Sequence, residues 1–190
     1  MRINSFSTGL AVDDLRSVAA LPSVDAIVIP KVNSAEDISV VEEIIRDVAP
    51  DRAEPLRLLA LIESARAVMD LREICQASPN LKGLIFAAED FAADVGIRRS
   101  RGMIEMAYAR SAVVIAARAH EIESAIDVVC TDLSIECGAM ALRPEASKGR
   151  SFGFTGKREW DPLPGFSSLL FLSPPPPSLF FALSLCGGSS

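Results

Sequence analysis

Two carboxylates in this sequence have a spacing and flanking residues that suit metal-ion chemistry. Glu63 follows the apolar run Leu56–Ile62, and Asp90 comes soon after Leu84–Ala87, 27 residues further along the chain. Neighbouring parallel strands lie about 5 Å apart, so carboxylates at the ends of two adjacent strands can converge on one cation. Hard oxygen ligands with few protein contacts suit Mg²⁺, which fills its remaining positions with water and substrate oxygens.

A second interpretation of the same two residues is structural. Each acid also precedes a predicted helix, and a carboxylate near a helix N-terminus stabilises that helix through its dipole and its unpaired N–H groups. On spacing alone, the structural interpretation is the favoured one.

The elements that would position these acids alternate between strand and helix. Apolar runs predict strands at 25–30, 56–62, 84–87 and 126–131, a weaker strand at 152–155, and the end of another at 2–4. Near-continuous apolar strands are typical of a parallel sheet that is buried on both faces. Helical patterns are predicted over 34–48, after a capping box that begins at Ser34, and over 64–78 and 102–120.

This order of elements predicts an α/β fold with right-handed crossovers. The sequence has no G-x-G-x-x-G after a first strand and no G-x-x-x-x-G-K-[ST], so an open nucleotide-binding sheet loses its main support. Polar residues instead follow the predicted strands, among them Lys31, Glu63, Asp90, Asp132 and Lys157. The carboxyl ends of parallel strands share one rim, where (β/α)₈ barrels carry their chemistry.

Composition excludes several classes of protein. The 190 residues include 19 Lys and Arg against 25 Asp and Glu, and a net charge of -6 is poorly suited to nucleic-acid binding. The N-terminal residues lack the apolar region of a secretory signal. The four cysteines form no C-x-x-C pair, so we expect reduced, buried thiols rather than a metal cage. We therefore expect an intracellular, cytoplasmic protein, with mitochondria as the alternative compartment.

The last part of the chain differs from the rest. Residues 158–190 are rich in Pro, Phe, Ser and Leu, and the apolar stretch 166–185 has about the length of a bilayer span. Four consecutive prolines at 174–177 divide this stretch into two runs that are too short to cross a membrane. We expect no membrane span, and we interpret 158–190 as a disordered, low-complexity tail after a domain that covers 1–157.

Several segments of residues 1–157 together resemble one family. They are R-I-N at 2–4, L-I-E-S-A-R-A-V at 61–68, F-A-A-E-D-F-A-A-D-V-G at 86–96, A-I-D-V-V-C-T-D at 125–132 and G-R-S-F-G-F-T-G-K at 149–157. In order and spacing these segments resemble the HpcH/HpaI aldolase and citrate lyase β-subunit family. The resemblance implies a (β/α)₈ TIM barrel of the phosphoenolpyruvate/pyruvate-like type.

The resemblance also implies roles for individual residues. Glu63 and Asp90 would hold Mg²⁺, and Glu63 would also face the substrate. Arg2 would contact the substrate, and backbone N–H groups from Ala88 to Asp90 would hold its carboxylate. Apart from the resemblance, the Glu89 side chain faces either the substrate or solvent, and a supporting role behind the substrate contacts is the favoured interpretation. With the family pattern added, metal ligation becomes the favoured interpretation of Glu63 and Asp90.

The implied activity is that of a Mg²⁺-dependent carbon–carbon lyase, which cleaves or forms a bond by aldol or Claisen chemistry. Its substrate would be a CoA thioester or a small 2-oxo acid, and its assembly a homo-oligomer, either a trimer or a hexamer. The chain departs from the family pattern on both sides, because strands usually precede R-I-N and an I-H-P-like segment usually follows G-F-x-G-K. We therefore expect an incomplete barrel that lacks the first strands. The alternative function is a catalytically inactive, truncated homologue that associates with full-length relatives.

Other polar residues near these segments have simpler interpretations. The cluster formed by Arg98, Arg99 and Arg101 could meet CoA phosphates, but a solvated loop is favoured. Lys31 either lines the rim or pairs with an acid, and Asp94 caps a helix or packs near Gly96.

Overall fold

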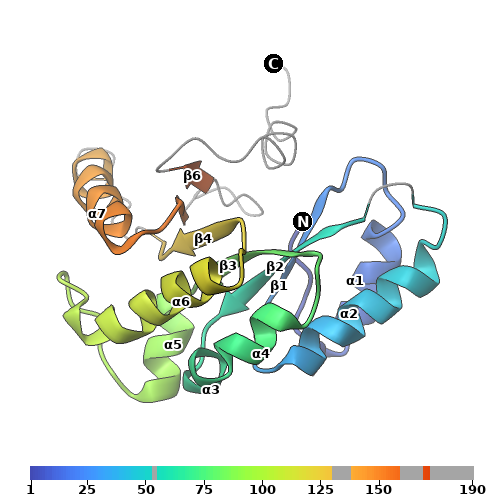
Figure 1. Ribbon diagram of the computed structural model, residues 1–190, viewed down its shortest axis with the longest axis horizontal. Coiled ribbons are helices and arrows are strands. Elements are labelled where there is room, and N and C mark those ends of the chain that lie inside the picture. Colours follow the sequence, from blue (N-terminus) through green and yellow to red (C-terminus); the bar gives the residue numbers. More distant parts are fainter. Residues whose placement is uncertain (53–54, 130–137, 159–168, 172–190) are drawn as a thin grey trace.

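Strands and helices alternate along the chain in the computed structural model, which describes residues 1–52, 55–129, 138–158 and 169–171 (Figure 1). The strands are β1 (Ala26–Ile29), β2 (Arg57–Ile62), β3 (Leu81–Phe86), β4 (Ser124–Asp127), β5 (Gly156–Arg158) and β6 (Leu169–Phe171). The α-helices are α1 (Ala11–Val18), α2 (Ala35–Val48), α3 (Ala65–Met69), α4 (Leu71–Gln76), α5 (Ala88–Val95), α6 (Ala107–Ala119) and α7 (Gly138–Phe152). Short 3₁₀ turns at Phe6–Thr8 and Ile104–Met106 precede α1 and α6.

The strands form one sheet whose spatial order follows the chain order from β1 to β6. All neighbours from β1 to β5 pair in parallel, whereas β6 pairs antiparallel with β5. Residues 1–3 continue the sheet beyond β1, since the Ile3 N–H donates to the Val28 carbonyl at 3.2 Å and the Val28 N–H donates to the Met1 carbonyl at 2.7 Å. The predicted strand end at 2–4 is thus present as a short parallel segment.

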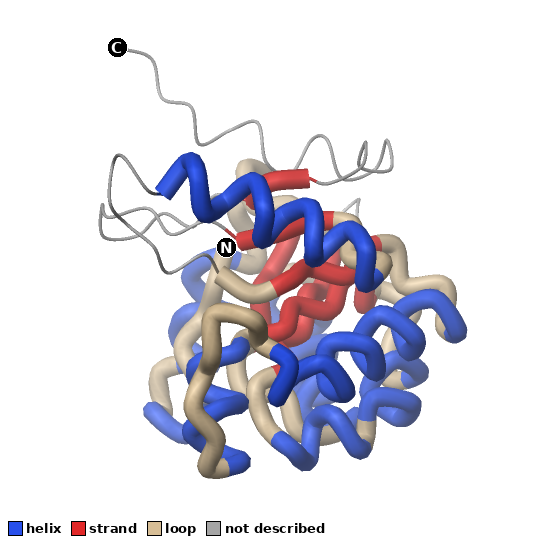
Figure 2. Tube along the Cα trace, turned by 90° about the vertical axis from the view of Figure 1, so that its left-hand side faces the viewer, coloured by secondary structure: helices blue, strands red, loops and turns tan. Residues whose placement is uncertain are grey.

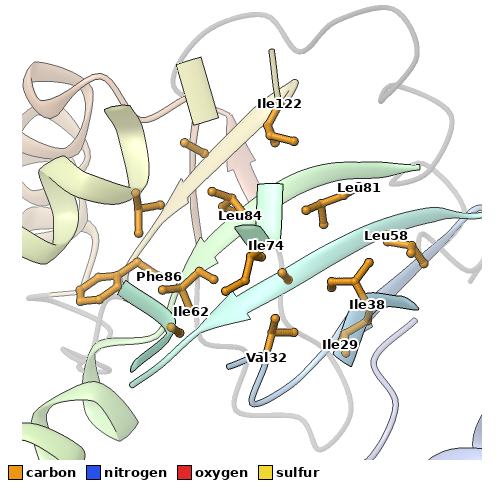
Figure 3. Packing of buried hydrophobic residues seen from close by; sticks show 14 of the residues in the cluster. Ile29, Val32, Ile38, Leu58, Ile62, Ile74, Leu81, Leu84, Phe86 and Ile122 are labelled. Atoms are coloured by element: carbon orange, nitrogen blue, oxygen red, sulfur yellow. The ribbon is translucent and has the colours of Figure 1, made fainter. Parts of the chain in front are cut away.

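Both faces of this sheet carry buried apolar side chains. One face packs against the helices α1 to α6, which lie along the same side of the strands (Figures 1 and 2). Figure 3 shows this packing, in which strand residues meet helix residues such as Ile38 and Ile74. The opposite face carries a second buried cluster of Leu59, Leu61, Ile85 and Ile126. The prediction of strands buried on both faces is confirmed.

The sequential strand order identifies the architecture. Parallel neighbours that follow one another in the chain require right-handed crossovers on one face, so the sheet winds in a single direction. A doubly wound sheet would reverse its order at a switch point and place helices on both faces. The parallel strands β1 to β5 therefore form an open segment of a (β/α)₈ barrel, and β6 adds antiparallel to β5 outside that pattern.

Local sequence signals explain the helices that were predicted. The N–H groups of Asn33 and Ser34 both donate to the Asp37 carboxylate, at 2.8 and 2.9 Å, which confirms the capping box at the start of α2. The pattern over 64–78 forms two helices, α3 and α4, which meet at Asp70. Ser64 caps the first of them by accepting a hydrogen bond from the Ala67 N–H at 3.0 Å.

The predicted strand at 152–155 is wrong. Phe152 is the last residue of α7, Gly153 has a φ of 99°, and β5 begins only at Gly156. The two phenylalanines gave the segment its strand-like apolar pattern, but their rings pack beside the Arg110 guanidinium. The Arg110 Cζ lies 4.2 Å from the centroid of the Phe152 ring and 5.7 Å from that of the Phe154 ring. β4 also begins and ends earlier than the predicted 126–131, and residues 130–131 lie outside the described residues.

The region interpreted as a tail includes one described element. The strand β6 lies within 158–190 and pairs with β5, which the composition of that region did not predict. The other residues from 159 onward, including the prolines at 174–177, lie outside the described residues. No helix in the described part of the chain combines the length and the apolar composition that crossing a bilayer requires.

Cys75 is a buried, unbonded thiol in α4, as predicted, and the other three cysteines lie outside the described residues. Burial raises the pKa of this thiol from its ordinary value of 9.0 to about 11. The protonated thiol is therefore the form that the folded chain prefers. The unfolded chain ionises first as the pH rises, so the contribution is complete below pH 9 and is lost between pH 9 and pH 11.

We expect this thiol to add a specific loss of stability at alkaline pH. Raising the pH from 8 to 10 should lower the free energy of unfolding by about 1 kcal/mol through Cys75 alone. Urea unfolding of the unchanged chain and of Cys75→Ala at both pH values isolates this contribution. The stability advantage of the unchanged chain over the variant should shrink by that amount, and a constant difference would contradict the assignment.

Candidate functional site

Glu63 lies buried at the carboxyl end of β2. It continues the alternation of Leu59 and Leu61, which face away from the helices, and only 5% of its surface is exposed. Its Oε1 accepts a hydrogen bond from the Lys31 N–H at 2.7 Å. Lys31 directly follows Pro30 at the end of β1 and has a φ of 54°, a left-handed conformation that is uncommon for a residue with a side chain. The neighbouring strand thus supplies a backbone donor to this carboxylate.

Asp90 lies beside Glu63 in the first turn of α5. The two carboxyl groups lie close enough to interact electrostatically, although their residues are 27 positions apart. Burial raises the pKa of Glu63, and the Asp90 carboxylate raises it further, while the Lys31 N–H and the Arg2 guanidinium lower it. The structure therefore brings together the two carboxylates that the spacing suggested.

Arg2 reaches the same place from the other side of β1. It is in register with Val28, which in turn is in register with Leu59, and these neighbours face the side of the sheet that the helices do not cover. Glu63 continues that face beyond the end of β2. The Arg2 guanidinium lies close enough to lower the pKa of the Glu63 carboxyl. A cation is thus present beside the carboxylate pair.

The first turn of α5 offers backbone donors at the same rim. Ala88, Glu89 and Asp90 begin the helix, and the preceding residue Ala87 provides no side-chain cap. The first N–H groups of a helix have no acceptor within that helix, which makes such a turn suitable for an anion. The residues 88–90 assigned to carboxylate binding do therefore form a helix N-terminus next to Glu63.

Glu89 is directed to a different partner from Asp90. Its carboxylate forms an ion pair with Arg99, which also donates to the Val129 carbonyl at 3.0 Å. The Arg99 side chain is only 16% exposed and lies 3.8 Å from Glu145 of α7. Arg98 and Arg101 are exposed on this loop, as predicted, but the prediction is wrong for the Arg99 side chain, which connects α5 to the end of β4 and to α7.

Sequence reasoning missed a buried charge network next to this rim. Arg110 of α6 forms a bidentate pair with Asp127 of β4, with distances of 3.0 and 2.7 Å, and both side chains are fully buried. The buried Lys157 ammonium lies 4.0 Å from Asp127 and 3.0 Å from Glu145, and donates to the Val128 carbonyl at 3.0 Å. Two signals in the sequence could have revealed this network: Arg110 stands on the apolar stripe of a helix, and Asp127 stands within a strand.

The donor set at the rim fits a hard divalent cation. Within the described residues no group of three or more His, Cys, Asp or Glu side chains gathers in a way that could hold a metal ion. Two adjacent carboxylates, one of them buried, are nevertheless a set that Mg²⁺ uses, because it commonly binds one or two carboxylates and completes its octahedron with water and substrate oxygens. The repulsion that raises the Glu63 pKa is the kind that a bound cation relieves.

Comparison with known proteins gives the chain a family. The sequence profile of HpcH/HpaI aldolase/citrate lyase matches residues 1–162. This chain belongs to the HpcH/HpaI aldolase/citrate lyase family. The match covers the whole described sheet except β6, so the family identified from the sequence motifs is confirmed.

Relatives within the HpcH/HpaI family show where the chain corresponds to larger proteins. A citrate lyase subunit beta-like protein from Deinococcus radiodurans is 32% identical over 157 residues, which are 83% of this chain and 51% of that protein. The mitochondrial citramalyl-CoA lyase of Homo sapiens is 31% identical over 171 residues, with coverage of 83% and 48%. The chain thus spans about half the length of these curated relatives.

A solved HpcH/HpaI-type structure has the same fold. The protein CitE from Mycobacterium tuberculosis, determined in complex with magnesium and pyruvate, superposes with a TM-score of 0.67 and 28% sequence identity. The superposition covers 85% of this chain and 62% of CitE. The barrel class predicted from the family resemblance is therefore confirmed for the described residues.

Proposed function

We propose that this chain is a carbon–carbon lyase whose Glu63 and Asp90 hold Mg²⁺, and that its substrate is a CoA thioester or a small 2-oxo acid. The observation that carries the proposal is the convergence of a buried Glu63, Asp90 and the Arg2 guanidinium at one end of the sheet. The relatives support it, because one is named a citramalyl-CoA lyase and CitE was solved with magnesium and pyruvate.

The metal would be held by carboxylate oxygens of Glu63 and Asp90. One Glu63 oxygen accepts from the Lys31 N–H, which fixes the orientation of the carboxylate relative to the end of β2. When bound there, Mg²⁺ supplies a Lewis acid that stabilises negative charge developing on substrate oxygens as a carbon–carbon bond breaks or forms.

The remaining groups would recognise the substrate. Arg2 presents a planar guanidinium whose paired N–H groups match the geometry of a carboxylate. The N–H groups of Ala88, Glu89 and Asp90 would donate hydrogen bonds to a second anionic group at the start of α5. Glu89 would act indirectly, because its ion pair with Arg99 ties this turn to β4 and α7.

Magnesium removal and replacement tests the proposed reaction. We would assay the full chain with citramalyl-CoA and follow release of a 2-oxo acid, after checking by thermal melting that the chain folds cooperatively. Activity should require Mg²⁺, should disappear with EDTA and should return when Mg²⁺ is added in excess. A chain that melts cooperatively and binds Mg²⁺, yet cleaves neither this thioester nor malyl-CoA, would contradict the lyase proposal and favour the inactive homologue.

A further inference from the structure

The proposed metal ligands stand on two separate segments that the fold must hold together. Glu63 lies between β2 and α3, and Asp90 lies in the first turn of α5. Two carboxylates of like charge repel one another, so their separation depends on contacts that each segment makes with its neighbours. The contacts beside Glu63 and Asp90 therefore decide how well the pair is prepared for a cation.

Glu63 and the residue after it are tied to the loop that follows β1. The Lys31 N–H donates to Glu63, and the Ser64 hydroxyl donates to the side-chain oxygen of Asn33. The Asn33 amide in turn donates to the Lys31 carbonyl at 3.2 Å. These bonds fix Glu63 relative to β1, but none of them reaches α5.

Two other hydrogen bonds connect the Glu63 segment to the Asp90 segment. On the strand side, the Ala87 N–H donates to the Ile62 carbonyl at 3.0 Å, which extends the ladder between β2 and β3. On the helix side, the Asp94 carboxylate accepts a hydrogen bond from the Ala65 N–H at 2.8 Å. Asp94 is one helical turn after Asp90 on α5, and Ala65 is two residues after Glu63.

The segments 62–65 and 87–94, joined by these two hydrogen bonds, form a closed ring that contains Glu63 and Asp90. The ladder bond lies just before Glu63 and Asp90, and the Asp94 bond lies just after them. The ladder bond is made by backbone alone, whereas the second bond depends on one side chain. We infer that Asp94 is a positioning residue that sets the separation of Glu63 and Asp90 through its hydrogen bond to the Ala65 N–H. This inference rests on the proposed metal site.

The consequence for metal binding is specific. Asp94→Ala opens the ring on its helix side and leaves the strand ladder intact, so the chain should still fold while the carboxylates lose their fixed spacing. Groups that only orient metal ligands typically change metal affinity by 10-fold to 100-fold when removed, and we expect a loss of about tenfold here. Asp94→Asn keeps an oxygen that accepts from the Ala65 N–H, so its affinity should stay within about threefold of the unchanged chain.

Glu42→Ala is a matched control for the structural role of such a contact. Glu42 of α2 accepts hydrogen bonds from Ser78 and from the Asn80 side chain, the latter at 2.9 Å, just before β3 begins. It therefore connects a helix to the sheet through a carboxylate, as Asp94 connects two helical segments, but at the opposite end of the strands. Its loss should lower the melting temperature without changing metal affinity.

Titration with Mn²⁺, followed by the electron paramagnetic resonance of the free ion, measures this affinity in the full chain without any assay of turnover. Measurements are made well below the melting temperature of every variant. Equal Mn²⁺ affinity in Asp94→Ala and the unchanged chain would overturn the inference alone. An equal loss in Glu42→Ala, or a failure of Asp94→Asn to restore binding, would also overturn it. Absence of saturable binding in the unchanged chain would overturn the proposed metal site together with it.

Discussion

Asp90→Ala is expected to weaken Mg²⁺ binding by more than about a hundredfold, because removing groups that merely support a metal ligand already costs about 10-fold to 100-fold. The variant leaves Glu63 as the single acid of the pair, beside the Arg2 guanidinium. A single carboxylate with a cation nearby attracts a second cation much less than two adjacent carboxylates do. Any Mg²⁺-dependent cleavage should fall in parallel.

Isothermal titration of Mg²⁺ into the full chain measures this effect directly. Glu63→Gln should behave like Asp90→Ala, since an amide keeps the shape of the side chain but removes its charge. Glu73→Gln is the control, because Glu73 is an exposed acid on α4 away from the rim. If Asp90→Ala bound Mg²⁺ as tightly as the unchanged chain, the two acids would be helix-stabilising groups, as their spacing alone favours.

The second large effect concerns stability and the buried pair of Arg110 and Asp127. Breaking a buried ion pair by removing one partner typically destabilises a protein by about 3–5 kcal/mol, because the other charge is left uncompensated. The loss of stability in Arg110→Met should lie at the lower end of this range, since the Lys157 ammonium remains 4.0 Å from Asp127. Asp127→Leu should cost more, because it leaves the fully buried Arg110 without an acid.

Urea unfolding distinguishes these cases. Combining Arg110→Met with Asp127→Leu should recover part of the loss, since apolar residues of similar volume can replace a buried pair at little cost. The exposed pair of Arg16 and Asp13 provides the comparison, and Arg16→Met should change stability by less than about 1 kcal/mol. Losses of equal size for the exposed and buried arginines would contradict this account of the network.

The sequence predicted the elements whose signals are local. Apolar runs located the first four strands to within a few residues, and the capping box at Ser34 located the start of α2. The pattern over 152–155 failed because Phe152 and Phe154 are apolar for a tertiary reason, the cover of the Arg110 guanidinium, which no local period reveals.

The candidate site was likewise predictable only where its signals are local. Glu63 and Asp90 were accessible because each follows a recognisable strand, and the family motifs then gave them a role. The contact between Asp94 and the Ala65 N–H was not accessible, since it depends on how α5 is placed against the start of α3. Asp94 does cap a helix, as predicted, but that helix is α3, which belongs to the preceding strand–helix unit and not to its own.

The strand order that follows the chain order has a consequence for synthesis. The residues of the proposed metal site and its supports, from Arg2 to Asp94, all lie before the end of α5 and so before β4. Because the chain is synthesised from its N-terminus, the units that carry these residues leave the ribosome before the later ones. Contacts between successive units are short in sequence, and such contacts form early. A nascent chain therefore possesses both carboxylates, their arginine and their positioning aspartate before β4 has been made, so the rim can assemble while translation continues.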